Sequence, residues 1–109
     1  MSLLRTRFAL GFVWLFQACM PGLPEPTAAH LAVARQTEPN ATLEDLSRGR
    51  GSYAAKCGNC HALREPHSLP AGDWQRVVTE MQEKQGVRLT PQENRDIVRY
   101  LDAVAGATR

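Results

Sequence analysis

The stretch KCGNCHAL, residues 56–63, places two of the chain's three cysteines three positions apart, with a histidine directly after the second. Cys57, Cys60 and His61 therefore form a C-x-x-C-H pattern. A close cysteine pair can belong to a zinc site, a redox-active dithiol, a disulfide or a site of covalent cofactor attachment. The choice among these depends on the compartment of the protein and on the secondary structure around the motif.

Residues 1–18 have the pattern of a secretory signal peptide. Arg5 and Arg7 precede Phe8–Ala18, a largely apolar run of 11 residues. This run is shorter than the roughly 17 to 25 residues of a membrane-spanning helix, but it fits the core of an export signal. A buried helix is the alternative interpretation. We therefore expect an exported, periplasmic protein.

The third cysteine directly follows the apolar run. The stretch FQACMPG, which contains Cys19, resembles the lipobox of bacterial lipoproteins, although Phe16 and Gln17 depart from its usual leucine and small residue. The resemblance implies that Cys19 is lipidated and tethers the mature protein to a membrane. Ordinary cleavage after Ala29 or Ala34, which would discard Cys19, is the alternative.

Residues 19–41 are predicted to be a proline-rich linker, and residues 42–109 the folded domain. Proline at the density of this segment resists helix formation and disfavours central strands. The prolines are Pro21, Pro24, Pro26 and Pro39. The whole chain has a formal net charge of only +2 and no basic stripe, so nothing in it indicates a nucleic-acid partner.

The domain is predicted to be all-α, with three main helices. Thr42 followed by Asp45, and Thr90 followed by Glu93, have the spacing of helix N-caps. The predicted helices are Leu43–Lys56, Asp73–Gln85, and a third that opens with TPQE at 90–93 and ends at Gly106. The second has an apolar stripe of Trp74, Val77, Val78 and Met81, and the third one of Ile97, Tyr100, Leu101 and Val104.

These observations favour covalent haem attachment at the motif. Two thiols one helical turn apart can add to the two vinyl groups of a haem, which leaves His61 placed to ligate the iron. A zinc site would need about four ligands, and a thioredoxin-like dithiol would need a βαβ pattern; the sequence has neither. A disulfide between residues three apart would be a strained structural link.

The chain also resembles the class I c-type cytochromes. Gly49 and Tyr53 stand eight and four residues before Cys57, as in the amino-terminal helix of that family, and Tyr100-Leu101 matches its carboxy-terminal aromatic–leucine pair. The resemblance implies a small cytochrome c-like fold in which these two helices cross at Gly49. Residues 74–81 are similar to the W-x-x-V-V-x-x-M helix of a subgroup of short bacterial cytochromes.

The resemblance implies that Met81 is the sixth iron ligand. A thioether opposite a histidine favours Fe(II) and raises the reduction potential. His67 is the chief alternative, although its loop would have to travel around the haem from His61, and an open site is a further one. Met81 could also serve only to pack the core, and His30 lies in the predicted linker.

Two further residues are candidate partners of the haem. Trp74 could pack on it or donate its indole N–H to a propionate, or could simply belong to the core. Arg64 could pair with a propionate or could be an ordinary exposed arginine.

The expected function is electron transfer by a mono-haem c-type cytochrome rather than catalysis. Its partners would be a periplasmic dehydrogenase, another cytochrome, or a terminal oxidase or reductase, and it could be a subunit of such a complex. A haem-based sensor or gas-binding module would need an open or displaceable sixth position. A haem peroxidase would need in addition a distal base, for which the sequence offers no candidate.

Overall fold

The computed structural model describes residues 22–58 and 63–107. Within these ranges the chain has four α-helices, one short 3-10 helix and no strand, which confirms the predicted all-α fold. The elements are α1 (Ala28–Arg35), α2 (Leu43–Lys56), the 3-10 helix η1 (Pro66–Ser68), α3 (Trp74–Lys84) and α4 (Pro91–Gly106). None of the described helices is long and apolar enough to cross a bilayer.

The three predicted helices are confirmed, because their local signals work as expected. The Thr42 hydroxyl accepts the Asp45 backbone N–H at 3.1 Å, and the Asp45 carboxylate accepts the Thr42 N–H at 2.9 Å. Thr90 and Glu93 form the same reciprocal cap on α4, at 3.1 and 3.0 Å. Each cap satisfies backbone donors that a helix start leaves without partners. α3 is one residue shorter at each end than predicted.

α1 corrects one prediction, because it lies inside the segment 19–41 that was expected to be a linker. The prolines of the described part of that segment flank α1, which begins after Pro26 and ends before Pro39. A proline opposes a helix only where it stands within it. Thr27 and His30 cap α1 reciprocally, with the imidazole Nδ1 accepting the Thr27 N–H at 3.0 Å. The boundary of the domain at residue 42 remains a prediction.

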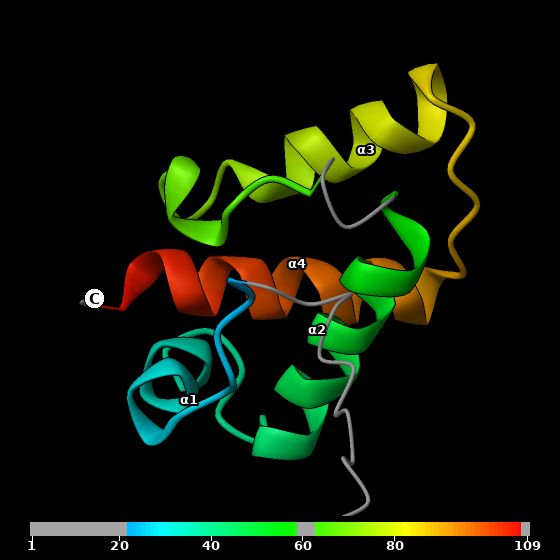
Figure 1. Cartoon of the computed structure of the whole chain (residues 1–109). Coiled ribbons are helices and arrows are strands. Elements are labelled where there is room, and N and C mark those ends of the chain that lie inside the picture. Colours follow the sequence, from blue (N-terminus) through cyan, green and yellow to red (C-terminus); the bar gives the residue numbers. More distant parts are fainter. Residues whose placement is uncertain (1–21, 59–62, 108–109) are drawn as a thin grey trace, which may run out of the picture.

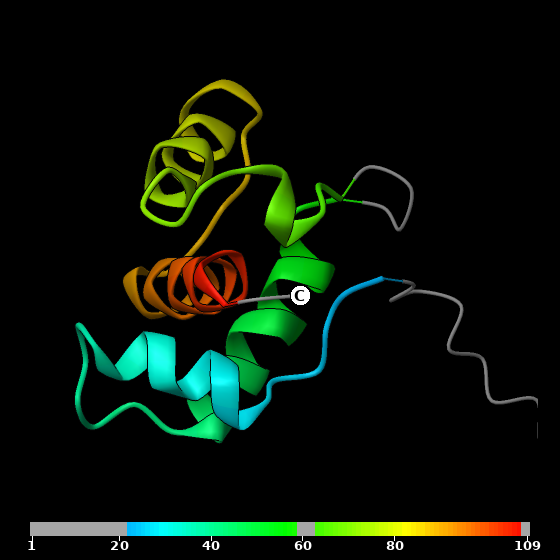
Figure 2. The ribbon, with the colours of Figure 1, turned by 90° about the vertical axis from the view of Figure 1, so that its left-hand side faces the viewer.

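The residues before α1 are also fixed to the helical body. The Tyr100 hydroxyl donates to the carbonyl of Pro24 at 2.7 Å, and Arg50 donates to the carbonyl of Leu23 at 3.1 Å. Leu23 itself is buried. Figures 1 and 2 show α1 on one side of α4 and α3 on the other. The described part of this segment is thus packed against the helices from Leu23 onward.

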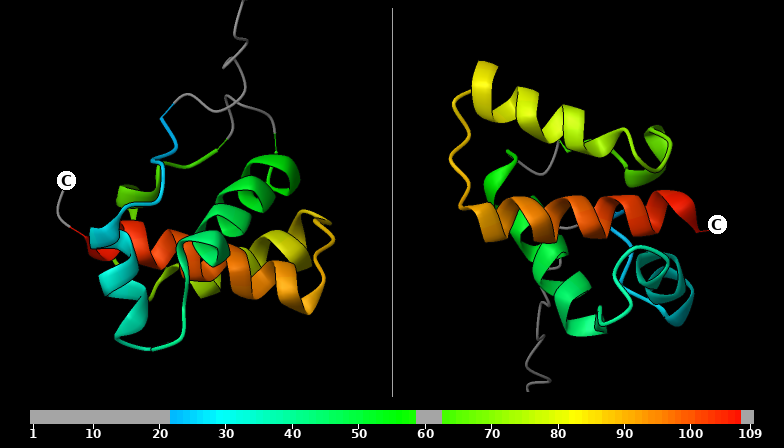
Figure 3. Two further views of the ribbon diagram at one scale, coloured as in Figure 1. Left: turned by 90° about the horizontal axis from the view of Figure 1, so that it is seen from below. Right: turned by 180° about the vertical axis from the view of Figure 1, so that it is seen from behind.

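α2 crosses α4 at very close range, as Figure 3 shows. A Cβ atom on Gly49 would lie 2.7 Å from both the carbonyl carbon of Asp96 and the Cβ of Tyr100, and would collide with the Asp96 carbonyl oxygen. Only glycine permits this approach. The core forms at the crossing, and its members from the two helices include Leu46, Ile97, Tyr100, Leu101 and Val104, all 0% exposed.

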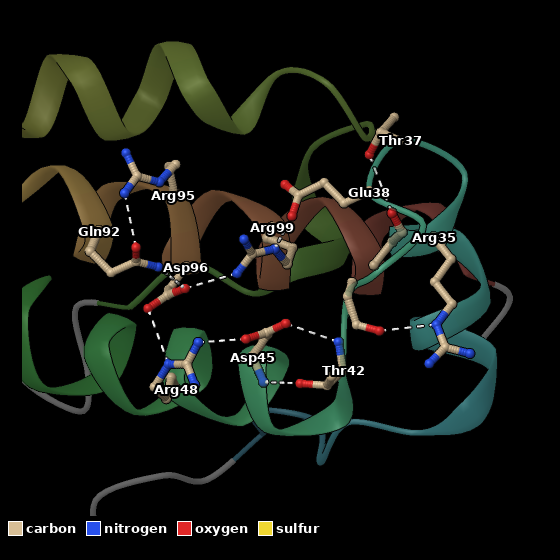
Figure 4. Close-up of polar contacts among 12 residues, drawn as sticks. Arg35, Thr37, Glu38, Thr42, Asp45, Arg48, Gln92, Arg95, Asp96 and Arg99 are labelled. Carbon is tan, nitrogen blue, oxygen red and sulfur yellow. Dashed lines mark hydrogen bonds and ion pairs between the residues drawn. The ribbon is translucent and has the colours of Figure 1, made fainter.

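A polar network joins α2 and α4 beside this core (Figure 4). The buried Asp96 carboxylate accepts hydrogen bonds from Gln92 and Arg99, both at 2.8 Å, and from Arg48 at 3.5 Å. Arg99 also pairs with Glu38 at 2.7 Å, which ties the loop after α1 to α4. A buried carboxylate is tolerated when it is paired and hydrogen-bonded in this way.

Candidate functional site

A cavity of about 310 Å³ lies between the carboxy-terminal end of α2, the loop that follows the motif, and α3. No close backbone contact joins α2 to α3 among the described residues, whereas both helices contact α4. The aromatic, apolar and sulfur-containing residues that line the cavity are Tyr53, Cys57, Trp74, Val77, Val78 and Met81. The cavity therefore separates two helices that share a common support.

The structure brings two of the four predicted haem residues to this cavity. Cys57 follows the last residue of α2 and is buried, and Met81 is a half-buried residue of α3. Cys60 and His61 lie outside the described residues, and so does Cys19. A thiol and a thioether from elements 24 residues apart in sequence thus border one space.

The environment of Cys57 argues against a redox-active dithiol. Burial raises the pKa of its thiol to about 11. Disulfide oxidoreductases instead use thiols whose pKa is lowered toward or below 7. A free Cys57 thiol would be neutral at pH 7, which disfavours thiol–disulfide exchange at this residue.

Two aromatic residues of the cavity wall hold the loop that follows the motif. The rings of Tyr53 and Trp74 meet edge to face, with centroids 6.1 Å apart. The Tyr53 hydroxyl donates to the carbonyl of Arg64 at 2.7 Å, and the Trp74 indole N–H donates to the carbonyl of Pro66 at 3.1 Å. Trp74 is therefore a core residue whose only donor is used within the protein. Its predicted alternative, an N–H bond to a propionate, is not what the structure has.

The burial of Tyr53 gives it a second property. Its side chain is only 4% exposed, and burial raises the pKa of its hydroxyl to about 12. The phenol therefore stays protonated and remains a hydrogen-bond donor throughout the neutral range. It joins the last turn of α2 to the far side of the motif.

His67 lies elsewhere. It is half-buried in η1 and is not among the described residues that line the cavity. Its charge instead acts on His30 of α1, whose pKa is lowered first by burial and second by His67. His30 is buried and engaged in the cap of α1. Neither histidine is among the described residues that line the cavity with Met81.

Sequence reasoning missed two of the three basic residues at the cavity. Arg76 and Lys84 of α3 line it, as does Arg64, which was considered only as one candidate partner of the haem. Lys84 stands three residues after Met81, a spacing that places both on one side of a helix. That spacing is the signal that could have found it.

The residues of the cavity fit a haem. A haem is a large, mostly apolar group with an iron that accepts thioether or imidazole ligands and with two carboxylates at one edge. The cavity offers a buried thiol, a thioether, apolar and aromatic walls, and basic side chains. An apolar space with a few convergent polar groups is the usual form of a cofactor site.

Comparison with known proteins gives one match. A sequence model of the dihaem cytochrome c family matches residues 53–109, which is more than half of the chain. The match includes the whole motif, Met81, α3 and α4. It names dihaem proteins, whereas the residues themselves indicated the mono-haem class I group. No curated protein and no solved structure matches the chain.

Proposed function

The chain belongs to the dihaem cytochrome c family, and on that premise we propose that it is an exported electron carrier with one covalently bound haem c. Membership in a family of c-type cytochromes implies covalent haem and favours electron transfer over catalysis. The observation that carries the finer proposal is the cavity shared by Cys57 and Met81. Haem c, when bound, supplies a one-electron Fe(III)/Fe(II) couple.

Cys57 and Cys60 are the attachment residues in this proposal, and His61 is the proximal ligand. The buried thiol of Cys57 at the cavity wall supports the first assignment. Tyr53, before the motif, donates a hydrogen bond to the carbonyl of Arg64, after it. This bond joins the described residues on the two sides of the motif.

The proposal of one haem rests on the cysteine count. Attachment through two thioethers uses two cysteines, and these 109 residues contain a single C-x-x-C-H motif. Cys19 is the only other cysteine. A second haem attached in the same way would need a further pair, so the two haems in the name of the family are not both provided by this motif.

Met81 is the proposed distal ligand. It borders the same cavity as Cys57, whereas His67 does not. Met81 and Val77 are half-buried, although the neighbouring stripe residues Trp74 and Val78 are fully buried. Apolar side chains that remain partly exposed on a cavity wall are expected where a cofactor completes the packing. The stripe would also keep water away from the sulfur.

The cellular setting is part of the proposal. The signal-like residues 1–18 support export to the periplasm, and the lipobox-like sequence supports lipidation of Cys19. Leu23, four residues after Cys19 in the sequence, is buried against the helical body. A lipid at that position would hold the haem domain close to the membrane surface. The partners would be a dehydrogenase, another cytochrome, or a terminal oxidase or reductase.

The ligand assignment is tested by absorption spectra and reduction potentials of the purified holoprotein. Met81→His should remove the weak near-infrared sulfur–iron band and lower the potential, because imidazole favours Fe(III) more than a thioether does. His67→Ala is the matched control and should leave both nearly unchanged.

Other outcomes would contradict the assignment. Loss of the low-spin spectrum in His67→Ala, with the sulfur–iron band kept in Met81→Ala, would show that Met81 is not the distal ligand. A high-spin spectrum without that band in the wild-type protein would indicate an open site and a sensor or gas-binding module instead.

A further inference from the structure

Among the described residues that line it, the cavity has more basic than acidic side chains. Its charged lining residues are Arg64, Arg76 and Lys84 against Glu80 alone, a net charge of +2. The ionisable groups Tyr53 and Cys57 add no negative charge at pH 7, because burial raises the pKa of both well above neutrality. The space therefore has a positive potential.

One of the three cations is already partnered. Arg76 and Glu80 stand four residues apart on α3 and form an ion pair at 3.2 Å. The side chains of Arg64 and Lys84 are exposed and make no ion pair or hydrogen bond within residues 22–58 and 63–107. Two cations thus remain for a ligand.

Several other cations on the described surface are paired with carboxylates of the protein. Arg50 pairs with Glu25, Lys56 with Glu93, and Arg99 with Glu38 and Asp96. Arg48 pairs with Asp45 and Asp96. Arg88 also makes no ion pair or hydrogen bond among the described residues, so Arg64 and Lys84 are distinguished from it by their place at the cavity.

Arg64 and Lys84 approach the cavity from two walls. The Tyr53 hydroxyl fixes the backbone of Arg64 through its carbonyl, at 2.7 Å, on the loop that follows the motif. Lys84 extends from the last turn of α3, three residues after Met81. One cation is therefore set by the attachment side of the cavity and the other by the helix that carries the thioether.

We propose that Arg64 and Lys84 form a dicarboxylate-binding pair that holds the two propionates of the haem and helps to set its reduction potential. This inference rests on the proposed function. The two cations match the two carboxylates in charge and number. A positive charge beside the haem stabilises the more electron-rich Fe(II) state and keeps the propionates ionised.

The test compares charge-removing and charge-keeping variants of the full-length holoprotein. Arg64→Gln and Lys84→Gln should each lower the reduction potential at pH 7, and the double variant should lower it further. The pH range over which the potential changes with propionate ionisation should move upward, because the neighbouring cation no longer lowers the carboxylate pKa. Arg64→Lys and Lys84→Arg should restore both properties.

Arg88→Gln is the matched control, because it removes the same charge from an exposed residue that does not line the cavity. Potentials of the cavity variants equal to that of Arg88→Gln would overturn the inference. So would unchanged potentials with an altered salt dependence of electron exchange, which would assign the two cations to the docking of an acidic partner. Covalent haem and the low-spin spectrum are recorded for every variant, so a failure of the proposed function itself is seen separately, as the absence of haem.

Discussion

α2 and α3 both pack against α4, but α2 is in close contact with α4, whereas one face of α3 borders the cavity. Gly49 of α2 meets the backbone of Asp96 so closely that no side chain fits between them. α3 instead faces the cavity with Val77 and Met81 half-buried, and one of the residues that anchor it, Trp74, donates its indole N–H to Pro66 of the short 3-10 helix η1.

The difference indicates which parts of the fold are stabilised by contacts within the chain and which by the cofactor. The crossing of α2 and α4 has a continuous apolar core and a satisfied polar network around Asp96. The stripe of α3 is completed only if a ligand fills the cavity. A ligand that binds the folded state alone stabilises it, and here most of that effect should fall on α3.

The largest expected effect follows from removal of the attachment residues. The double variant Cys57→Ser and Cys60→Ser should lose all covalent haem, because neither thioether can form. Amide hydrogen exchange should then show a greater loss of protection in α3 than in α2 and α4, since α3 loses its packing partner. Haem staining after denaturing electrophoresis and exchange measured by mass spectrometry would record the two results.

Cys19→Ser is the control, because it removes a cysteine outside the motif and should leave haem and exchange unchanged. An equal loss of protection in α2, α3 and α4 would contradict the idea that the haem mainly stabilises α3. It would mean that the α2–α4 crossing also depends on the haem.

A smaller effect is expected at the crossing itself. Gly49→Ala should lower the free energy of unfolding by about 3 kcal/mol, the upper end of the range for overpacking, because the new Cβ meets backbone atoms that cannot move aside. Gly51→Ala, two positions away on the exposed side of α2 with nothing within 4 Å, should instead raise it by roughly 0.5–1 kcal/mol. Urea unfolding of both holoproteins measures the difference, and equal effects would contradict the close approach.

The helices of the domain could be predicted because their signals are local. Thr42 and Thr90 each stand three residues before an acidic residue, and the apolar residues of α4 repeat at helical spacing. All four predicted apolar residues of α4 are buried. Gly49 could be identified only through the family resemblance, because spacing alone does not tell which glycine meets another helix.

α1 and the basic lining of the cavity could not be predicted in the same way. The cap of α1 uses His30 where a glutamate or glutamine is usual, and the prolines around it hid a short helix. Arg64 was considered from the sequence, but Lys84 stands 20 residues after it, and only the folded structure shows that both line one cavity. Such an arrangement depends on how α3 folds over α4, which no local pattern records.

The smallest expected effect concerns α1, which packs against α4 and α2 and does not line the cavity. His30 must be neutral to accept the Thr27 N–H, and burial followed by the charge of His67 lowers its pKa. Its folded pKa lies below the unfolded value of about 6.5, so the unfolded chain binds the proton first as the pH falls. Stability should therefore be complete above about pH 6.5 and decrease as the pH falls below it.

His30→Gln isolates this contribution, because glutamine can still accept the Thr27 N–H at the same capping position but does not titrate. Urea unfolding of the holoprotein at pH 8 and pH 5.5 should show a smaller decrease for His30→Gln than for the wild type. His67→Gln should make the acid-induced decrease only a little smaller than in the wild type. It removes the second cause of the lowered His30 pKa but leaves burial, the larger cause, in place. The same decrease in wild type and His30→Gln would mean that α1 does not depend on a neutral His30. The acid sensitivity would then have to come from the haem side of α4.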